Sequence, residues 1–289
     1  MLGTRPRETS TQKTERESLA LSKYEKALKI WSHYTSDTDL NSFVAIGSLY
    51  QALARFRGLA STAVNMQKHY DLAITNFQLA LDKALTDHES IHILYLLFSI
   101  YRSLMLSKGK EEIKQYGPQC RYYAELSLNK MVKVYLENDM RTAQLFEELG
   151  TICSFHLGDH DAALAYNKEA LAIKLRNPNQ SPWMLYTNIS SHYFSRKNYP
   201  EALRFQLLNH EDILNRFALK ATDNDATRRE KRYMIARSYM TVGDYYTPLD
   251  RQLSLQYLQM AKNLYQELEH PSSATEIEKI EKKIEALCT

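Results

Sequence analysis

Residues 70–81 read Tyr-Asp-Leu-Ala-Ile-Thr-Asn-Phe-Gln-Leu-Ala-Leu, and this stretch decides the fold. Within it Ala73, Phe77 and Ala80 have the spacing Ala-x3-aromatic-x2-Ala. On an α-helix residues at this spacing share one face, and small alanines at both ends of that face let a second helix approach closely. The segment therefore predicts a helix that packs tightly against a neighbouring helix.

The same pattern recurs along the chain, in full or in weakened form. Two of its copies lie 202 − 163 = 39 residues apart, and each follows a turn signal. Self-similarity at a regular spacing is the signature of a repeat architecture in which each unit stacks on the next. We call the segments that carry the pattern second-type helices, and they begin their patterns at Ala20, Ala73, Ala124, Ala163, Ala202 and Ser254.

A different pattern precedes most of these segments, namely a large residue, an apolar one, a small one and an aromatic one at helical spacing. Phe43-x2-Ile46-Gly47-x2-Tyr50 is its clearest form. We call the segments that carry it first-type helices. The other copies are Leu94-x2-Leu97-Phe98-x2-Tyr101, Phe146-x2-Leu149-Gly150, Tyr186-x2-Ile189-Ser190-x2-Tyr193 and, with the large residue replaced by Arg232, Ile235-Ala236-x2-Tyr239.

The alternation of the two helix types resembles the tetratricopeptide repeat (TPR) over roughly residues 18 to 269. The resemblance implies an all-α fold, a right-handed superhelical α-solenoid of stacked antiparallel hairpins whose first-type helices line a concave groove. Five pairs and a leading half-repeat fit the pattern. The steps between second-type helices are longer than the family's usual period of roughly 34 residues, which is more similar to the repeats of kinesin light chains and bacterial peptide receptors.

Longer loops or helices must absorb the extra residues. Breaks are expected where polar residues, Gly or Pro gather, at residues 55–68, 108–119, 215–227 and 245–252. The unit around Gly150 also carries one extra residue before the turn at Gly158.

The ends of the chain are expected to differ from the repeats. Residues 1–15 are polar and predict a disordered tail, and residues 16–289 predict a single solenoid domain. After Pro271, the stripe Ile277, Ile280, Ile284 and Leu287 predicts a capping helix over about residues 273–287. Such a helix covers the apolar face that the last repeat would otherwise expose.

Composition narrows the possible functions. The 289 residues include only eight Gly and seven Pro, which favours helices, and 37 basic residues nearly balance 34 acidic ones, so no nucleic-acid partner is implied. The longest apolar stretch, residues 91–106, is interrupted by polar side chains and predicts a buried helix instead of a membrane span. Three widely spaced cysteines and the lack of an apolar leader favour a reducing, cytoplasmic location.

Two histidine pairs raise the alternative of an enzyme. His88-Glu89-Ser90-Ile91-His92 matches the H-E-x-x-H pattern, in which a helix presents two zinc ligands and a general base. The pentapeptide directly follows Thr86-Asp87, where a helix start is expected, and a first turn is a poor platform for a catalytic metal. His156 and His160 are separated by Gly158 and Asp159, which predict a turn. The favoured interpretation is structural in both places, with no metal and no cofactor.

The resemblance therefore implies a non-catalytic scaffold or adaptor that binds a protein or peptide, and it leaves the oligomeric state open. A zinc-dependent peptidase is the alternative. In the family the groove is lined by first-type residues next to the packing positions. Ser48, Ser99 and Thr151 stand where the clamp for heat-shock protein tails needs Asn, which disfavours that ligand. The residues that the resemblance places in the groove are Gln51, Tyr95, Arg102, Glu147, Thr151, Thr187, Asn188, Ser191, Phe194, Tyr233 and Arg237.

Overall fold

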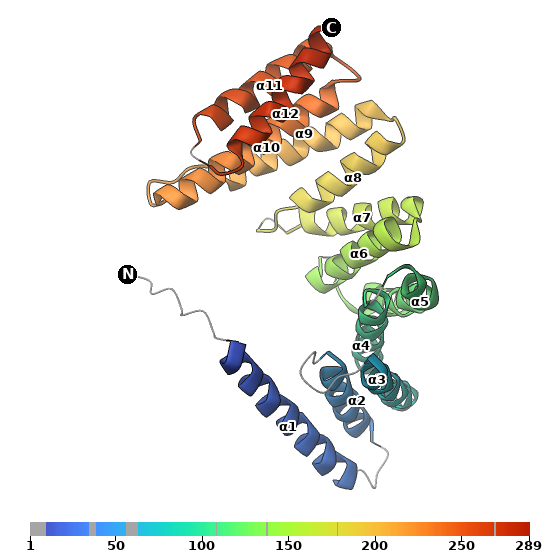
Figure 1. The fold of residues 1–289 in the computed structure, drawn as a ribbon. Coiled ribbons are helices and arrows are strands. Elements are labelled where there is room, and N and C mark those ends of the chain that lie inside the picture. The colour runs from blue at the N-terminus through green and yellow to red at the C-terminus, as the bar shows by residue number, and fades with distance from the viewer. Residues whose placement is uncertain are drawn as a thin grey trace. The chain divides into compact units, whose positions relative to one another are not determined.

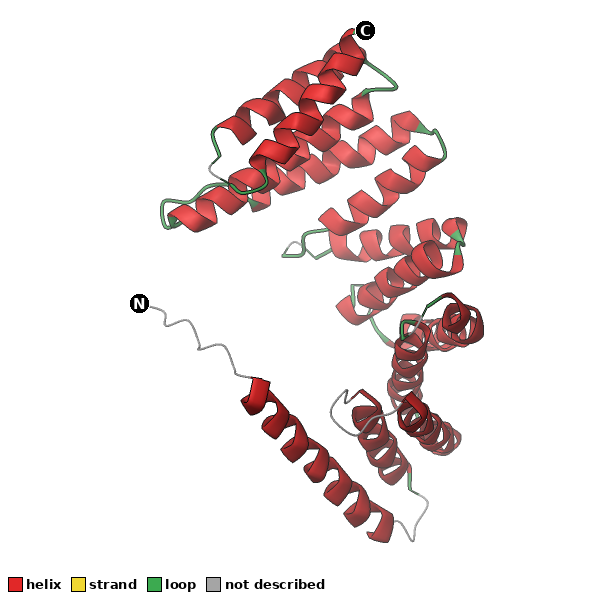
Figure 2. Ribbon diagram, in the orientation of Figure 1, coloured by secondary structure: helices red, strands yellow, loops and turns green. Residues whose placement is uncertain are grey.

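A computed structural model describes residues 10–34, 39–55, 63–107, 109–136, 138–177, 179–268 and 270–289. Helices alone make up the regular structure of these residues, as Figure 2 shows. The contacts divide the chain into two compact units, Met1–Leu136 and Glu137–Thr289, which are described separately. The all-α fold predicted from the repeat patterns is confirmed.

The first unit holds a leading helix and two hairpins (Figure 1). The leading helix α1 spans Ser10–Tyr34. It begins inside the segment 1–15 for which the sequence predicts a tail, and residues 1–9 lie outside the described residues. The hairpins pair α2 (Leu40–Arg55) with α3 (Ala63–Lys83), and α4 (Asp87–Met105) with α5 (Lys110–Val134).

The second unit holds three hairpins and a final helix. The hairpins pair α6 with α7, α8 with α9 and α10 with α11. Helix α12, Ser273–Cys288, is the predicted cap, and its Ile280 is fully buried against α10 and α11. The remaining helices span Met140–Ile152 (α6), His160–Leu175 (α7), Trp183–Ser195 (α8), Tyr199–Arg216 (α9), Asp225–Tyr246 (α10) and Arg251–Gln266 (α11).

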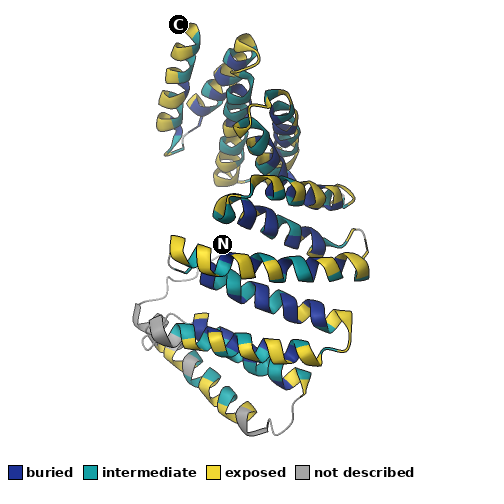
Figure 3. Ribbon diagram, turned by 90° about the vertical axis from the view of Figure 1, so that its right-hand side faces the viewer, coloured by how far each residue is buried: buried dark blue, intermediate teal, exposed yellow. Residues whose placement is uncertain are grey.

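From α3 onward, each second-type pattern becomes the buried face of its helix, drawn dark blue in Figure 3, whereas Ala20, Tyr24 and Ala27 of α1 are only half-buried. Ala73, Phe77 and Ala80 of α3 are fully buried in one cluster with residues of α2 and α4. Burying apolar area in this way is the dominant stabilising term of such a fold. The pattern that opened the sequence is therefore the packing face of the first unit.

Close approach within a hairpin depends on a small residue in its first-type helix. A Cβ atom built on Gly47 of α2 would lie 2.7 Å from the ring of Phe77 in α3. The residue that each such glycine contacts in the second-type helix lies four places after the Ala or Ser that begins the second-type pattern. The three glycine pairs of this kind are Gly47 with Phe77, Gly150 with Asn167 and Gly243 with Leu258.

This contact corrects the expected pattern in α10. The small residue that faces Leu258 is Gly243, in Tyr239-x2-Val242-Gly243-x2-Tyr246. The sequence pattern placed the small residue at Ala236, which is also buried in a cluster with residues of α11. The two positions are 243 − 236 = 7 residues apart, or about two helical turns. Both residues are buried, so the spacing alone did not distinguish them. Tyr233 and Arg237 were chosen from the pattern at Ala236, and they lie two turns nearer the start of α10 than the equivalent positions counted from Gly243.

The expected break at residues 108–119 is largely wrong, because α5 runs through Pro118 without interruption. A proline inside a helix removes one hydrogen bond and costs roughly 3 kcal/mol. Here the segment carries a buried face, with Gly117, Cys120 and Ala124 all buried in the hairpin with α4. We attribute the helix to that packing.

The extra residue before Gly158 is taken up by a wide helical turn. Cys153–Leu157 continues α6 as a π-helix, in which each turn holds one more residue than in an α-helix. Gly158 then adopts a left-handed conformation with φ of 69°, and the Asp159 side chain caps α7 by accepting from the backbone N–H of Ala162. The predicted turn between His156 and His160 is confirmed.

Candidate functional site

The candidate groove surface of the second unit is clearest on α8. The packing residues Tyr186, Ile189 and Ser190 are buried, whereas Thr187 and Ser191 are exposed and Asn188 is half-buried. Because residues three and four apart neighbour each other on a helix, Thr187, Asn188 and Ser191 form one small polar patch. No other described helix contributes as many exposed residues to the predicted groove as α8 does.

Hydrogen bonds hold part of the α8 patch in place. The Thr187 hydroxyl donates to the carbonyl oxygen of Trp183 at 2.9 Å, and it accepts from Nδ2 of Asn209 in α9 at 3.1 Å. The amide of Asn188 can donate and accept at once, which suits a peptide backbone. The second-type helix α9 thus orients a hydroxyl on the exposed face of the first-type helix α8. The repeat patterns did not predict this contribution.

Phe194 lies in the last turn of α8 and contacts aromatic rings of two other helices. Its ring lies 5.4 Å from the ring of Tyr199 in α9 and 4.8 Å from that of Tyr245 in α10. The Tyr245 hydroxyl in turn lies 3.3 Å from Ser190 Oγ. Phe194 is therefore a half-buried aromatic contact between α8 and its neighbours.

On α6 the two expected groove residues have different surroundings. Thr151 is exposed, and its hydroxyl donates to the carbonyl oxygen of Glu147 at 2.9 Å. Glu147 forms an ion pair with Lys174 of α7. Glu147 is half-buried, so Thr151 is the more accessible of the two.

The two α10 residues also differ. Arg237 is exposed. The Tyr233 ring stacks on His270 at 4.2 Å and meets Tyr265 edge-on at 5.5 Å, which packs it among the last helices. At the corrected groove position Asp244 pairs with Lys283 of α12, at 2.6 Å. The capping helix thus contributes one ion-pair partner to the first-type helix α10.

The three expected residues of the first unit lie on α2 and α4. Gln51 is buried, and its Nε2 donates to Ser99 Oγ at 2.6 Å, where Arg55 Nη2 also donates at 3.0 Å. Tyr95 and Arg102 flank Phe98 on α4, with ring centroids 5.6 Å apart for Tyr95 and the guanidinium 5.7 Å from the ring for Arg102. Gln51 therefore joins two first-type helices through its amide.

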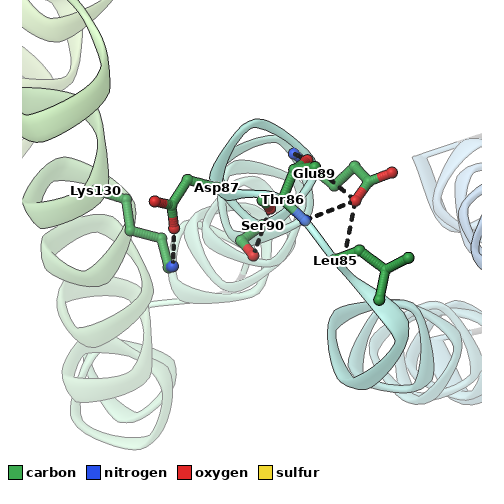
Figure 4. A network of polar contacts seen from close by, with 6 residues as sticks. All are labelled: Leu85, Thr86, Asp87, Glu89, Ser90 and Lys130. Carbon is green, nitrogen blue, oxygen red and sulfur yellow. Dashed lines mark hydrogen bonds and ion pairs between the residues drawn. The ribbon is translucent and has the colours of Figure 1, made fainter.

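The H-E-x-x-H segment forms the first turn of α4, and its glutamate is engaged in a cap. Glu89 Oε2 accepts from the backbone N–H groups of Thr86 and Leu85, both at 2.9 Å, while the Thr86 hydroxyl accepts from the N–H of Glu89 (Figure 4). These backbone bonds lower the pKa of Glu89 below its usual value. The sequence signal for this capping box is Thr-x-x-Glu, which the histidines obscured.

This arrangement does not favour the zinc peptidase. His88 and His92 are both exposed, and Asp87 beside them pairs with Lys130 of α5 at 2.5 Å. Within the described ranges, no three His, Cys, Asp or Glu side chains gather as a metal site would require. The residue needed as general base binds the backbone instead, as expected for polar residues at a helix start.

We expect Thr86→Ala to destabilise the first unit by about 1 kcal/mol, because one helix N–H loses its acceptor. Chemical denaturation followed by circular dichroism measures the change. The matched control is Thr75→Ala in the middle of α3, where the hydroxyl only donates to the carbonyl oxygen of Asp71. Equal stabilities of the two variants would contradict the capping role.

His160 is close to a histidine of another helix. Its ring lies 6.4 Å from that of His192 in α8, beside the ion pair of Arg196 with Asp161 at 2.6 Å. Burial, and then the charge of Arg196, lower the pKa of His192. A neutral imidazole is therefore favoured for His192 near neutral pH.

None of the described helices is both long enough and apolar enough to cross a membrane. The apolar stretch at residues 91–106 forms most of α4, and its Ile93, Leu97 and Ile100 are fully buried in the first unit.

Neither a family model nor a curated protein sequence gives a significant match to the chain. Solved structures do match. BtubC (BKLC) from P. vanneervenii has a TM-score of 0.55 at 18% identity, over 87% of this chain and 90% of that one. Nro1, described as a hypoxic regulator of sterol synthesis and a nuclear import adaptor, has a TM-score of 0.58 at 14% identity, over 92% and 88%.

A third match is a signal transduction ATPase of the STAND type with a tetratricopeptide repeat sensor, from Pyrococcus horikoshii. Its TM-score is 0.51 at 14% identity, and the match covers 93% of this chain and 38% of that one. At these identities the likenesses show the fold alone. The protein has the fold of TPR-like helical repeats, as the two alternating patterns predicted.

Proposed function

We propose that this protein is a non-catalytic scaffold or adaptor that binds another protein or a peptide along its first-type helices. The observation that carries the proposal is the polar patch on α8, where Thr187 and Ser191 are exposed and Asn188 is half-buried. The opposite face of the same helix is buried in the hairpin core. A face that packing does not need is thus available to a partner.

The chemistry of the candidate surface suits recognition of a backbone. Hydroxyl and amide groups donate and accept hydrogen bonds without requiring a charge on the ligand. Arg237 adds an exposed guanidinium on α10, which can pair with an acidic side chain of the partner. Because none of these groups forms a nucleophile–base pair, the surface is suited to holding a ligand and not to transforming it.

The fold supports this proposal without identifying the partner. Helical repeats of this type present extended surfaces on which other proteins are bound, and one structure of the same fold is described as a nuclear import adaptor. We place the protein in the cytoplasm because its cysteines are few and widely spaced along the sequence. A protein or peptide, and neither nucleic acid nor a membrane, is the proposed partner.

Affinity capture with the full chain and with the double variant Asn188→Ala, Arg237→Ala tests the groove assignment. We expect the variant to lose most of the partner recovered by the unmodified protein, because it removes a bidentate amide and a charged donor. The matched control is Asn263→Ala, Arg251→Ala, which removes the same two side-chain types from exposed positions on the second-type helix α11. Unchanged capture by the groove variant would refute the assignment.

A further inference from the structure

The first unit contains a cavity of about 680 Å³ that the groove does not use. It lies among α3, α4 and α5, so two of its three walls are second-type helices. Its volume is in the range of sites that hold a small ligand or a large side chain. The lining side chains that matter for its chemistry are Gln67, Asp71, Thr75, Tyr101, Glu112 and Tyr116.

A chain of hydrogen bonds orders one wall of this cavity. The Tyr116 hydroxyl of α5 lies 3.4 Å from Oε1 of Gln67 in α3 and donates to it. Gln67 Nε2 then donates to Asp71 Oδ1 at 2.9 Å. The wall thus fixes one carboxylate oxygen of Asp71 and leaves the other oxygen to accept from a ligand.

The second wall is aromatic. Tyr101 of α4 stacks on Tyr123 with ring centroids 5.3 Å apart and an interplanar angle of 12°, and the Tyr116 ring lies 6.5 Å away. Desolvation, then the charges of Tyr123 and Asp71, raise the pKa of Tyr101. Asp71 and Tyr101 both line the cavity, so acidic and aromatic groups face one space.

The charged side chains among the described lining residues are both acidic. Asp71 and Glu112 contribute carboxylates, and the described residues that line the cavity include no Lys, Arg or His. On the same turn of α5, Lys114 pairs with Glu111 at 3.1 Å and is largely exposed. Glu112 is half-buried and Asp71 is exposed, and carboxylates of one sign that line a concave surface raise the local concentration of cations.

We propose that this cavity binds the guanidinium group of an arginine side chain from a protein partner. A guanidinium is planar, carries five donors and stacks on aromatic rings, so it matches carboxylates beside tyrosines better than a compact ammonium does. The site is separate from the groove, and the proposal goes beyond the binding of a peptide along the first-type helices.

Titration of the full chain with blocked tripeptides, followed by saturation-transfer NMR, tests the proposal. The probes are acetyl-Gly-Arg-Gly-amide, its citrulline counterpart, which has the same shape without the charge, and free spermidine. We expect the arginine peptide to bind at least about tenfold more tightly than the citrulline peptide, the ratio expected for one charge-assisted contact. Spermidine is expected to bind more weakly than the arginine peptide.

A pair of neighbouring variants provides the control. Glu112→Gln removes a cavity carboxylate and is expected to weaken the arginine peptide about tenfold. Glu111→Gln removes the same charge from the same helical turn, but outside the cavity, and is expected to leave the affinity unchanged. Circular dichroism of both variants establishes that α5 is intact.

Three results would overturn the proposal: equal affinity for arginine and citrulline peptides, equal effects of the two glutamate variants, or tighter binding of spermidine than of the arginine peptide. The last result would assign the cavity to free polyamines. The groove variants Asn188→Ala and Arg237→Ala lie in the other unit and do not alter this titration. Failure of one proposal is therefore distinguishable from failure of the other.

Discussion

Phe77→Ala is expected to destabilise the first unit by about 3–5 kcal/mol, the range for removing a buried phenylalanine. The Phe77 ring is fully buried and fills the space beside Gly47, so its loss leaves a cavity between α2 and α3. The surrounding Ala73 and Ala80 are too small to close that cavity. Urea denaturation followed by circular dichroism measures the change.

Leu79→Ala on the same helix is the matched control, because its side chain is 41% exposed. Both variants introduce alanine into α3, and the propensity difference between Leu and Phe is below about 0.7 kcal/mol, so a larger difference between the variants reports burial. If Leu79→Ala were as harmful as Phe77→Ala, the packing face of α3 would be misassigned.

Gly243→Ala is expected to destabilise the second unit by about 1–3 kcal/mol through overpacking, reduced by up to about 1 kcal/mol from better helix propensity. The new Cβ would lie 2.8 Å from Leu258 Cγ and 3.2 Å from the backbone oxygen of Ser254. The side chain can shift, but the backbone of α11 cannot do so without moving the helix. Chemical denaturation measures the net effect.

A double-mutant cycle with Leu258→Ala tests whether this contact causes the loss. The smaller side chain makes room for the new methyl group, so the double variant is expected to be more stable than the sum of the two single effects predicts. Strict additivity would show that the contact with Leu258 does not cause the loss of stability.

The helices could be predicted because residues close to one another in the sequence define the packing face of each helix. Ala73, Phe77 and Ala80 lie within eight residues of one another, and their burial follows from helix geometry alone. The capping helix could be predicted in the same way, since Ile277, Ile280 and Ile284 form one apolar stripe along it. Patterns of this kind need no knowledge of which helix lies opposite.

The pattern in α10 was misplaced because the deciding contact is not local. Ile235-Ala236-x2-Tyr239 and Val242-Gly243-x2-Tyr246 have the same spacing on one long helix. Only the approach of Leu258, 258 − 243 = 15 residues further on, distinguishes them. A pattern that repeats every seven residues returns to nearly the same face, so the sequence offered two equivalent positions.

The candidate sites were less accessible to prediction. The groove residues came from a family resemblance, and the structure shows that packing already engages some of them, such as Gln51 with Ser99 and Tyr233 with His270. The cavity of the first unit unites side chains from Met66 to Tyr116 on three helices. No spacing rule links Asp71 to Glu112, because their proximity depends on how two hairpins stack.

The π-helical turn at Cys153–Leu157 has a consequence for how such proteins change over evolutionary time. One residue inserted into an ordinary helix rotates every later side chain by about 100° and would turn a buried face towards water. A wide turn just before a left-handed glycine absorbs the insertion where it occurs, and α7 keeps its orientation. Repeat length can therefore drift by single residues while the hairpins continue to fit, so alignments that demand a constant period would overlook relatives of this protein.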